Sequence, residues 1–280
     1  MEIASYRSLE LRTPDGLRIA AQDWARPTSG RDVLLIHGYS QSNLSWLKQC
    51  SGPLADEFRL VTYDIRGHGG SDKPLAAEFY GDAERWAGEI EAVISAAQLD
   101  HPVLVFWSYA GRIALDYLSR RGHGDISGLV FVSATSALDS NMTGPAAPLL
   151  RHMTDGDLAA NIEATTAFLQ ACTAQALPAA DLSFMLAFNM VVPPAVRAHL
   201  LGRSADYQAT LHALDVPVLV MHGDADALIL PSMGDYTVAN TRHARHVRYP
   251  GIGHMPFWEI PEQFNRDLAA FLREARGPRR

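Results

Sequence analysis

Cysteine is scarce in this chain of 280 residues, which contains only Cys50 and Cys172. The two thiols lie far apart in the sequence, and neither belongs to a group of residues with the spacing of metal ligands. A disulfide framework is therefore not indicated, and two reduced thiols are expected. The sequence predicts no metal site, and the chemistry proposed below requires no cofactor.

Long apolar runs and an excess of positive charge are also missing. No stretch approaches the roughly 20 apolar residues that cross a bilayer, and residues 1–7 lack the basic and apolar regions of a signal peptide. The chain has 24 Lys and Arg against 31 Asp and Glu, a net charge of −7, which disfavours contact with nucleic-acid phosphates. We expect a soluble, cytoplasmic protein that binds neither membranes nor nucleic acids. The sequence does not define its oligomeric state.

Hydrophobic residues, in contrast, make up 48% of the chain, enough for a sizeable core. Short β-branched runs alternate with longer helical stretches, which predicts an α/β fold with a mostly parallel sheet of about eight strands and helices on both faces. The expected strands are 7–12, 17–25, 33–36, 59–63, 103–106, 129–132, 218–221 and 246–249, the first two forming a hairpin. Helical spacing of apolar residues predicts helices at 83–97, 109–119 and 261–275.

One segment interrupts this alternation. Residues 136–210 contain no convincing strand but several amphipathic helical pieces, at 145–152, 157–173, 181–190 and 195–201. An all-helical insert between two strands is most simply a cap over the strand ends. We therefore predict a helical cap at 136–210, inserted after the sixth strand, and an α/β core formed by 1–135 and 211–280.

A serine stands where a buried strand turns sharply into a helix, in the run VLVFWSYAG at 103–111. Such a turn exposes the hydroxyl at the carboxyl end of a central strand, above a helix N-terminus that favours a developing oxyanion. An isolated serine at this place more often caps the helix. The loops that follow other strands, however, carry the groups that a nucleophilic serine requires. We therefore predict that Ser108 is a nucleophile and not only a helix cap.

Two later loops carry the remaining groups of a catalytic triad. The run VLVMHGDAD at 218–226 is an apolar strand followed by Asp224 and Asp226, and His254 lies in a Gly-rich loop after the last strand. The carboxyl ends of parallel strands line one crevice, so side chains distant in sequence converge there. Ser108, His254 and one of the two aspartates therefore form the predicted triad.

The strand at 33–36 leads into His37, Gly38 and Tyr39. A loop at this strand end can aim the backbone N–H of Tyr39 at the same point as that of Tyr109, which follows the serine. Two convergent donors form an oxyanion hole. We predict this role for the amides of Tyr39 and Tyr109, and a structural role for the His37 ring.

Together these motifs resemble the α/β-hydrolase superfamily over nearly the whole chain, and within it the serine esterase, lactonase and cofactor-free haloperoxidase branch. The matching motifs are His37-Gly38, DIRGHGGSD at 64–72, the Ser108 turn, HGDAD at 222–226 and Gly253-His254. The resemblance implies an α/β-hydrolase fold with a cap, and it implies that Asp226 rather than Asp224 is the acid of the triad. It also implies that the loop at 64–72 is structural.

The turn departs from the superfamily pattern Gly-x-Ser-x-Gly, because Phe106 and Ala110 occupy the glycine positions. Small residues are favoured there because strand and helix approach closely. Alanine fits with little disturbance, whereas the phenylalanine ring must turn into the core, crowd the site or shape an aromatic pocket. The substrate pocket is expected to include Phe106, Trp107, Phe168, Phe188 and Trp258.

The predicted reaction is hydrolysis of a small hydrophobic or aromatic ester or lactone through an acyl-enzyme. Relatives with the same triad also hydrolyse carbon–carbon bonds or use peroxide in cofactor-free perhydrolysis and haloperoxidation, and the sequence does not separate these reactions. A nucleophilic aspartate, as in dehalogenases, is disfavoured because Ser108 occupies that position. A ligand-binding protein with little turnover is the alternative from another class, favoured by Phe106 and disfavoured by the complete triad.

Overall fold

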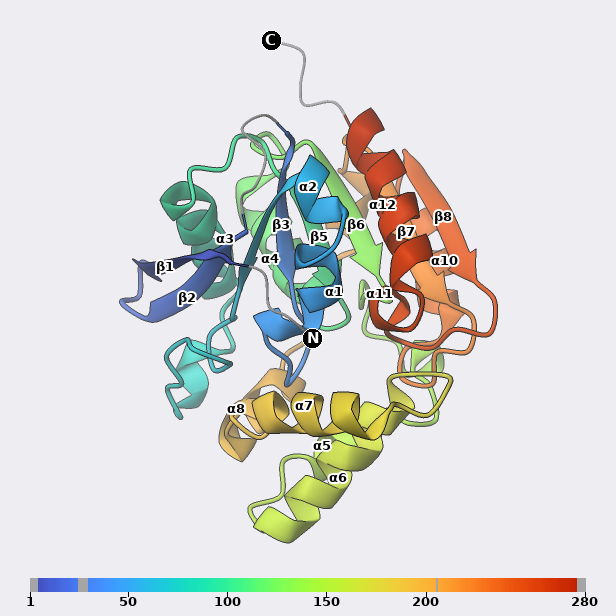
Figure 1. Ribbon diagram of the computed structural model, residues 1–280. Coiled ribbons are helices and arrows are strands. Elements are labelled where there is room, and N and C mark those ends of the chain that lie inside the picture. Colours follow the sequence, from blue (N-terminus) through green and yellow to red (C-terminus); the bar gives the residue numbers. More distant parts are fainter. Residues whose placement is uncertain (1–4, 25–29, 205, 276–280) are drawn as a thin grey trace.

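The computed structural model describes residues 5–24, 30–204 and 206–275. It contains one eight-stranded sheet with the strand order β1-β2-β4-β3-β5-β6-β7-β8 (Figure 1). The strands are β1 (Arg7–Arg12), β2 (Arg18–Asp23), β3 (Asp32–Ile36), β4 (Arg59–Tyr63), β5 (Val103–Trp107), β6 (Gly128–Val132), β7 (Val218–Gly223) and β8 (Ala244–Tyr249). Ala25, the predicted end of the second strand, lies outside the described residues, as do 1–4 and 276–280 of the predicted core and position 205 of the predicted cap.

The sheet is mostly parallel, as predicted. Strand β2 pairs antiparallel with β1 and with β4, and every pairing from β4 to β8 is parallel. All residues of β5, β6 and β7 are buried. Strands that are covered on both faces consist of nearly continuous apolar runs, which explains the sequences of these three strands. The carboxyl ends of these strands meet at one edge of the sheet.

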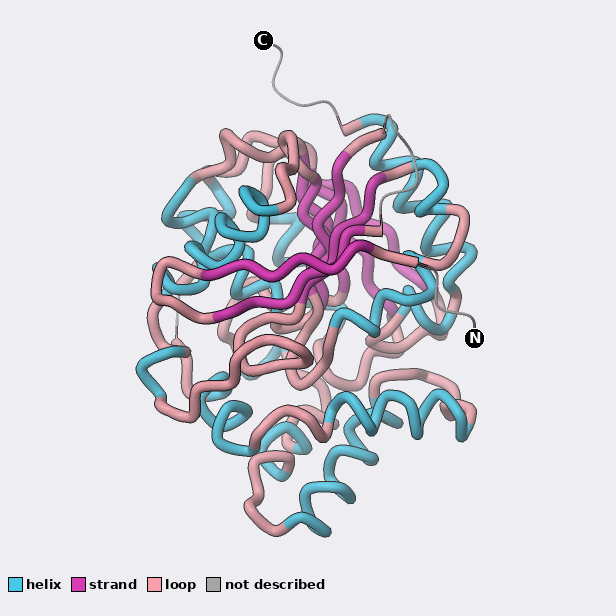
Figure 2. Tube along the Cα trace, turned by 60° about the vertical axis from the view of Figure 1, so that its left-hand side comes forward, coloured by secondary structure: helices cyan, strands magenta, loops and turns pink. Residues whose placement is uncertain are grey.

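Helices cover both faces of the twisted sheet, as Figures 1 and 2 show. Helices α3 (Ala83–Ala96) and α4 (Ala110–Arg121) pack on one face, and α1 (Leu47–Cys50) and α12 (Pro261–Glu274) lie on the other. The remaining elements of this part are α2 (Leu54–Glu57), α10 (Pro231–Ala239), α11 (Pro256–Glu259) and the 3₁₀ turns η1 (Asn43–Trp46), η2 (Ala77–Phe79) and η3 (Ser140–Met142). The predicted fold class is confirmed.

Between β6 and β7 the described residues form the 3₁₀ turn η3 and then five α-helices, which we call the helical insert. They are α5 (Leu149–His152), α6 (Leu158–Ala171), α7 (Ala179–Asn189), α8 (Pro194–Leu201) and α9 (Gln208–His212). Helices α5 to α8 lie beyond the arrowheads of the strands, at the edge where the predicted catalytic loops end (Figure 1). The division of the chain into a core and a cap stays a prediction.

Taken singly, none of the described helices has both the length and the apolar character needed to span a membrane. The bent pair α7 and α8, which meet at 85°, passes that test only by combined length and composition.

Arg197 on α8 holds the helical insert together. Its side chain is fully buried, and no carboxylate pairs with it in the described part of the chain. Nη1 donates to Met153 O at 3.0 Å and to Asn161 Oδ1 at 2.7 Å, while Nη2 donates to Asn189 O at 2.6 Å. Burial lowers the pKa of Arg197 to about 10. These bonds connect α8 to the end of α5, to α6 and to the end of α7.

Replacement of Arg197 by methionine is expected to lower the midpoint of thermal unfolding by roughly 4–10 °C, because two buried carbonyls and an amide oxygen each lose one of their donors. Differential scanning calorimetry measures the shift. Arg151→Met, on the exposed face of α5, serves as the control and should leave the midpoint within about 2 °C of wild type. Equal midpoints for the two variants would contradict the role given to Arg197.

Candidate active site

Ser108 lies in a strained turn between β5 and α4. Its φ is +57°, in the left-handed region that costs a non-glycine residue about 1–3 kcal/mol. Backbone bonds hold it there: Ser108 N donates to Val132 O at 3.0 Å, and Ser108 O accepts from Gly111 N and Thr135 N, each at 3.0 Å. The end of β6 therefore fixes the serine at the carboxyl end of the neighbouring strand.

Two glycines let the backbone approach closely around this turn. A Cβ atom on Gly111 would lie 2.4 Å from Thr135 O, and one on Gly38 would lie 3.0 Å from the Cβ atom of Ser108. Neither position accepts a side chain without movement of its neighbours. Gly38 thus brings the loop after β3 into contact with the serine.

Phe106 does not crowd the serine. Its side chain is fully buried, and its ring packs edge-to-face on Phe131 of β6 with centroids 4.4 Å apart. Alternate residues of a strand point to opposite faces, so this ring turns into the core beside β6. Of the arrangements open to Phe106, the structure shows packing into the core.

His254 and Asp226 form a buried pair. His254 Nδ1 donates to Asp226 Oδ2 at 2.7 Å, and the two side chains are 2% and 0% exposed. The other carboxylate oxygen, Oδ1, accepts from the backbone N–H groups of Leu228 and Ile229, each at 2.9 Å. The carboxylate is therefore held in one orientation, with Oδ2 turned to the imidazole.

A second histidine contacts the same carboxylate oxygen. His222 Nε2 lies 3.2 Å from Asp226 Oδ2 and also donates to Ile229 O at 3.0 Å. Burial would raise the pKa of Asp226, but the charge of His254 and the hydrogen bonds from both histidines outweigh it and hold that pKa well below its usual range. Asp224, in contrast, is exposed and accepts from Gly251 N, so the structure brings Asp226 and not Asp224 to His254.

The backbone amides predicted to form an oxyanion hole are both available. Among the described residues, no acceptor pairs with the N–H of Tyr39 or Tyr109, although both residues line the same cavity as Ser108. Their phenol groups instead donate to Leu150 O at 3.1 Å and Leu200 O at 3.0 Å, both in the helical insert. The two tyrosines thus connect the Ser108 turn and the loop after β3 with the insert, and their amides stay free of acceptors among the described residues.

Two buried histidines support the loop that carries Tyr39. His37 Nε2 accepts from Ile65 N and His68 Nε2 accepts from Ser40 N, each at 3.1 Å. Burial lowers the pKa of both rings, so both accept these bonds in the neutral form. Their geometry matches the structural role expected for His37 and for the loop at 64–72.

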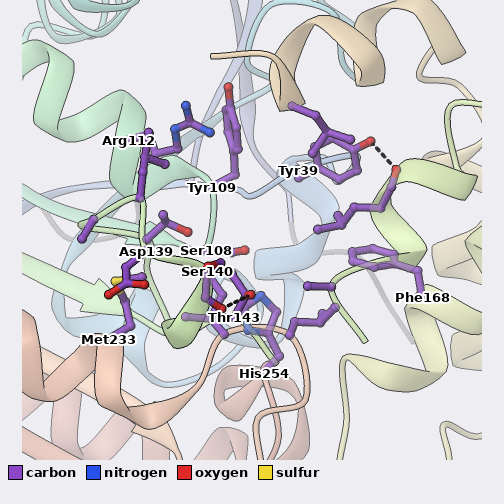
Figure 3. Close-up of a pocket in the computed structure, with 18 residues that line it drawn as sticks. Tyr39, Ser108, Tyr109, Arg112, Asp139, Ser140, Thr143, Phe168, Met233 and His254 are labelled. Atoms are coloured by element: carbon purple, nitrogen blue, oxygen red, sulfur yellow. Dashed lines mark hydrogen bonds between the residues drawn. The ribbon is translucent and has the colours of Figure 1, made fainter. Parts of the chain in front are cut away.

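Ser108 and His254 open into one cavity of about 290 Å³ (Figure 3). Its wall is mostly apolar and comes from the core and from the helical insert. The apolar part includes Tyr39, Leu150, Phe168, Leu201, Leu228 and Met233, and the polar part includes Arg112, Asp139, Ser140 and Thr143. The described residues contain no group of three or more His, Cys, Asp or Glu placed to hold a metal ion.

Only one of the five aromatic residues expected in the pocket lines this cavity, namely Phe168. The Trp107 indole donates to His254 O at 3.0 Å and packs edge-to-face on a ring of α11, so it supports the histidine loop from behind. The Trp258 indole donates to Asp181 of the helical insert at 3.0 Å. For these two tryptophans the prediction is wrong because hydrogen bonds hold both indoles elsewhere.

The other two aromatic residues pack against rings. Phe106 lies on β6 as described above, and Phe188 packs edge-to-face on Phe184 within α7, with centroids 5.5 Å apart. Neither reaches the cavity, so these predictions are wrong as well. The sequence reasoning also missed Arg112, which follows the serine by four positions and lines the cavity. A charged residue one turn after the serine was the available signal.

Comparison with known proteins identifies the family of this chain. Residues 33–261 match the family model of the alpha/beta hydrolase fold. The chain is 28% identical over 275 residues to a non-heme haloperoxidase of Rhodococcus erythropolis, covering 92% of this chain and 97% of that protein. It is 27% identical over 279 residues to a bifunctional esterase/perhydrolase of Acinetobacter calcoaceticus, covering 93% and 98%.

Solved structures give the same result. A Burkholderia cenocepacia protein assigned as an aryl esterase superposes with a TM-score of 0.91 at 33% identity, covering 96% of this chain and 99% of that one. An esterase from Rhodococcus sp. superposes with a TM-score of 0.89 at 30% identity, with the same coverage of 96% and 99%. The chain belongs to the α/β-hydrolase fold family and is a hydrolase enzyme.

Proposed function

We propose that this enzyme hydrolyses small hydrophobic or aromatic carboxylic esters or lactones through an acyl-enzyme on Ser108. One observation carries the proposal: His254, whose Nδ1 donates to the buried Asp226 carboxylate at 2.7 Å, shares a cavity with a serine held at φ +57°. A nucleophile, a base and a group that orients the base are the parts that acyl transfer requires.

In this mechanism the Ser108 hydroxyl attacks the ester carbonyl while His254 Nε2 takes its proton. The Asp226 carboxylate stabilises the imidazolium that forms. The amides of Tyr39 and Tyr109 donate to the oxyanion of the tetrahedral intermediate, and each such donor is worth about 3–4 kcal/mol of transition-state stabilisation. The imidazolium then protonates the departing alcohol, and water repeats the attack on the acyl-enzyme.

The cavity supports a small substrate. Its volume of about 290 Å³ lies at the lower end of the range of roughly 300–1,000 Å³ found for ligand pockets. Phe168, Leu201 and Met233 offer apolar contact, which suits a short acyl chain or an aromatic ring.

Perhydrolysis is a second candidate, favoured by the names of two relatives, a non-heme haloperoxidase and a bifunctional esterase/perhydrolase. In that reaction hydrogen peroxide replaces water in the attack on the acyl-enzyme and releases a peracid. The same Ser108, His254 and Asp226 serve both reactions, so the ratio of acid to peracid released in the presence of peroxide separates them.

Covalent labelling tests the nucleophile. A fluorophosphonate reagent is expected to attach to the wild-type enzyme at Ser108, and mass spectrometry of the peptide that contains residues 103–111 locates the adduct. The variant Ser108→Ala should fold, because it loses one hydroxyl, and should remain unlabelled. An adduct on a different serine, or no adduct on an enzyme that still hydrolyses esters, would overturn the proposed role of Ser108.

A further inference from the structure

Arg112 is a buried cation in the wall of the catalytic cavity. Only 6% of its surface is exposed, and its guanidinium lies over the ring of Tyr109 at 5.1 Å. Nη2 donates to Arg203 O, whereas the hydrogen bonds between described residues leave Nε and Nη1 without an acceptor. No carboxylate of the described chain forms an ion pair with Arg112. Buried charges are normally paired with a charge of opposite sign. This guanidinium lacks such a partner, and an anionic group of a ligand in the cavity would supply it.

The neighbouring arginine shows how this chain neutralises a buried guanidinium. Arg203 forms an ion pair with Asp116, and the other oxygen of Asp116 accepts from the Tyr207 hydroxyl at 2.9 Å. The carboxylate of this cluster is therefore already engaged. The cluster holds two guanidinium groups and one carboxylate, which leaves an excess of positive charge, and Arg112 is the member of the cluster that lines the cavity.

Arg112 is also suitably placed relative to the nucleophile. It lies four residues after Ser108, in the first turn of α4, and both residues line the same cavity. In Figure 3 its guanidinium and the Tyr109 ring lie on the opposite side of Ser108 from His254. A ligand whose carbonyl carbon is at Ser108 can therefore extend one end toward Arg112 within the same cavity.

We propose that Arg112 binds a carboxylate at the far end of the substrate, so that the preferred substrates are half esters of short dicarboxylic acids. Charge-assisted hydrogen bonds to the unpaired guanidinium donors hold this carboxylate, and they offset the cost of burying the cation. The inference rests on the proposed ester hydrolysis at Ser108 and adds the chemical class of the substrate.

The first test uses the purified full-length enzyme. The ratio of kcat/KM for monomethyl to dimethyl esters is measured for succinic, glutaric, adipic and pimelic acids. The subsite predicts a ratio above about 10 at one chain length, where the carboxylate reaches the guanidinium, and lower ratios for shorter and longer chains. Diesters preferred over half esters at every length in the wild type would overturn the proposal without any variant.

Variants of Arg112 then identify the residue responsible. Arg112→Gln is expected to lower the ratio about 10- to 100-fold at the optimal chain length, and Arg112→Lys should give an intermediate value because it keeps the charge without the planar guanidinium. Arg120→Gln removes the same charge from the exposed end of α4 and should keep the wild-type ratio. Equal ratios for Arg112→Gln and Arg120→Gln would overturn the subsite.

Asp139 provides an independent readout in the same cavity. Its carboxylate accepts from Asn141 N at 2.8 Å and is the acidic side chain among the residues that line the cavity. The Asp139 carboxylate repels an anionic ligand. Asp139→Asn is therefore expected to raise the ratio of kcat/KM for half esters to diesters about 2- to 5-fold. An unchanged or lower ratio counts against a carboxylate in this cavity.

A binding measurement separates this inference from the proposed function. Isothermal titration of adipate into Ser108→Ala, and into the double variant that also carries Arg112→Gln, reports the subsite without turnover. If adipate binding depends on Arg112 but the wild-type enzyme hydrolyses no ester, the carboxylate subsite is supported and the proposed ester hydrolysis is wrong. If hydrolysis depends on Ser108 but Arg112 affects neither adipate binding nor the ratio of kcat/KM for half esters to diesters, the ester hydrolysis is supported and the subsite is wrong.

Discussion

Ser108→Ala is expected to lower kcat for short-chain p-nitrophenyl esters by about 10⁵-fold or more, because the acyl-enzyme loses its nucleophile. The variant should still accelerate hydrolysis by about 10³–10⁴-fold relative to the uncatalysed reaction in water, since the free amides of Tyr39 and Tyr109 still stabilise the oxyanion when water attacks directly. Stopped-flow release of p-nitrophenol measures both effects. The burst that reports acyl-enzyme formation in the wild type is expected to disappear in the variant.

Ser133 offers a matched control for this experiment. It is a buried serine at the end of β6, it also has a positive φ, of 42°, and its hydroxyl has no partner among the described residues. Ser133→Ala removes the same atom from a neighbouring backbone position that does not line the cavity. Its kcat should stay within about 3-fold of wild type. A comparable loss in both variants would show that Ser108→Ala acts through the backbone of the turn rather than through chemistry.

The fold was predictable because its central strands have a strong local signal. Strands β5, β6 and β7 are buried on both faces and therefore consist of uninterrupted apolar runs. Strand β8 is at the edge, where Arg245 and Arg248 are exposed, and its first two residues were missed. The strand order, with β4 between β2 and β3, depends on pairings between distant segments that no local pattern encodes.

The convergence of the residues of the predicted triad was predictable for a different reason. Ser108, Asp226 and His254 each follow a strand of the same parallel sheet, and the ends of such strands face one crevice. The choice between Asp224 and Asp226 was not local, because it depends on which carboxylate the two backbone amides after the loop can hold. The sequence settled that choice only through the family resemblance.

The pocket could not be predicted, because its walls depend on how side chains pack in three dimensions. Trp107 is next to the serine in sequence but supports the histidine loop through its indole N–H. Phe188 lies in the helical insert at a plausible position, yet it packs on Phe184. Arg112 lies in the first turn of α4 close to Ser108, but only the packing of the helical insert around that turn makes it part of the cavity wall.

Asp226→Asn is expected to lower kcat about 10⁴-fold, and the structure gives the reason. Oδ1 of this residue accepts from Leu228 N and Ile229 N, so an asparagine must place its oxygen there. Its NH₂ group then faces His254 Nδ1 and donates to it, which moves the imidazole proton to Nε2, where the base is needed. His222 Nε2, already a donor to Ile229 O, would also meet a donor.

Asp224→Asn is the matched control, since it makes the same change two residues earlier on the same loop, at an exposed carboxylate. It should retain kcat within about 3-fold of wild type, while both variants keep the wild-type unfolding midpoint within a few degrees. Because His254 and His222 hold the pKa of Asp226 well below its usual range, the wild-type carboxylate stays ionised through neutral and mildly acidic pH. Protonation of Asp226 therefore adds nothing to the pH dependence of the wild type between pH 6 and pH 8. A kcat of Asp226→Asn within about 3-fold of wild type would mean that a different group orients His254.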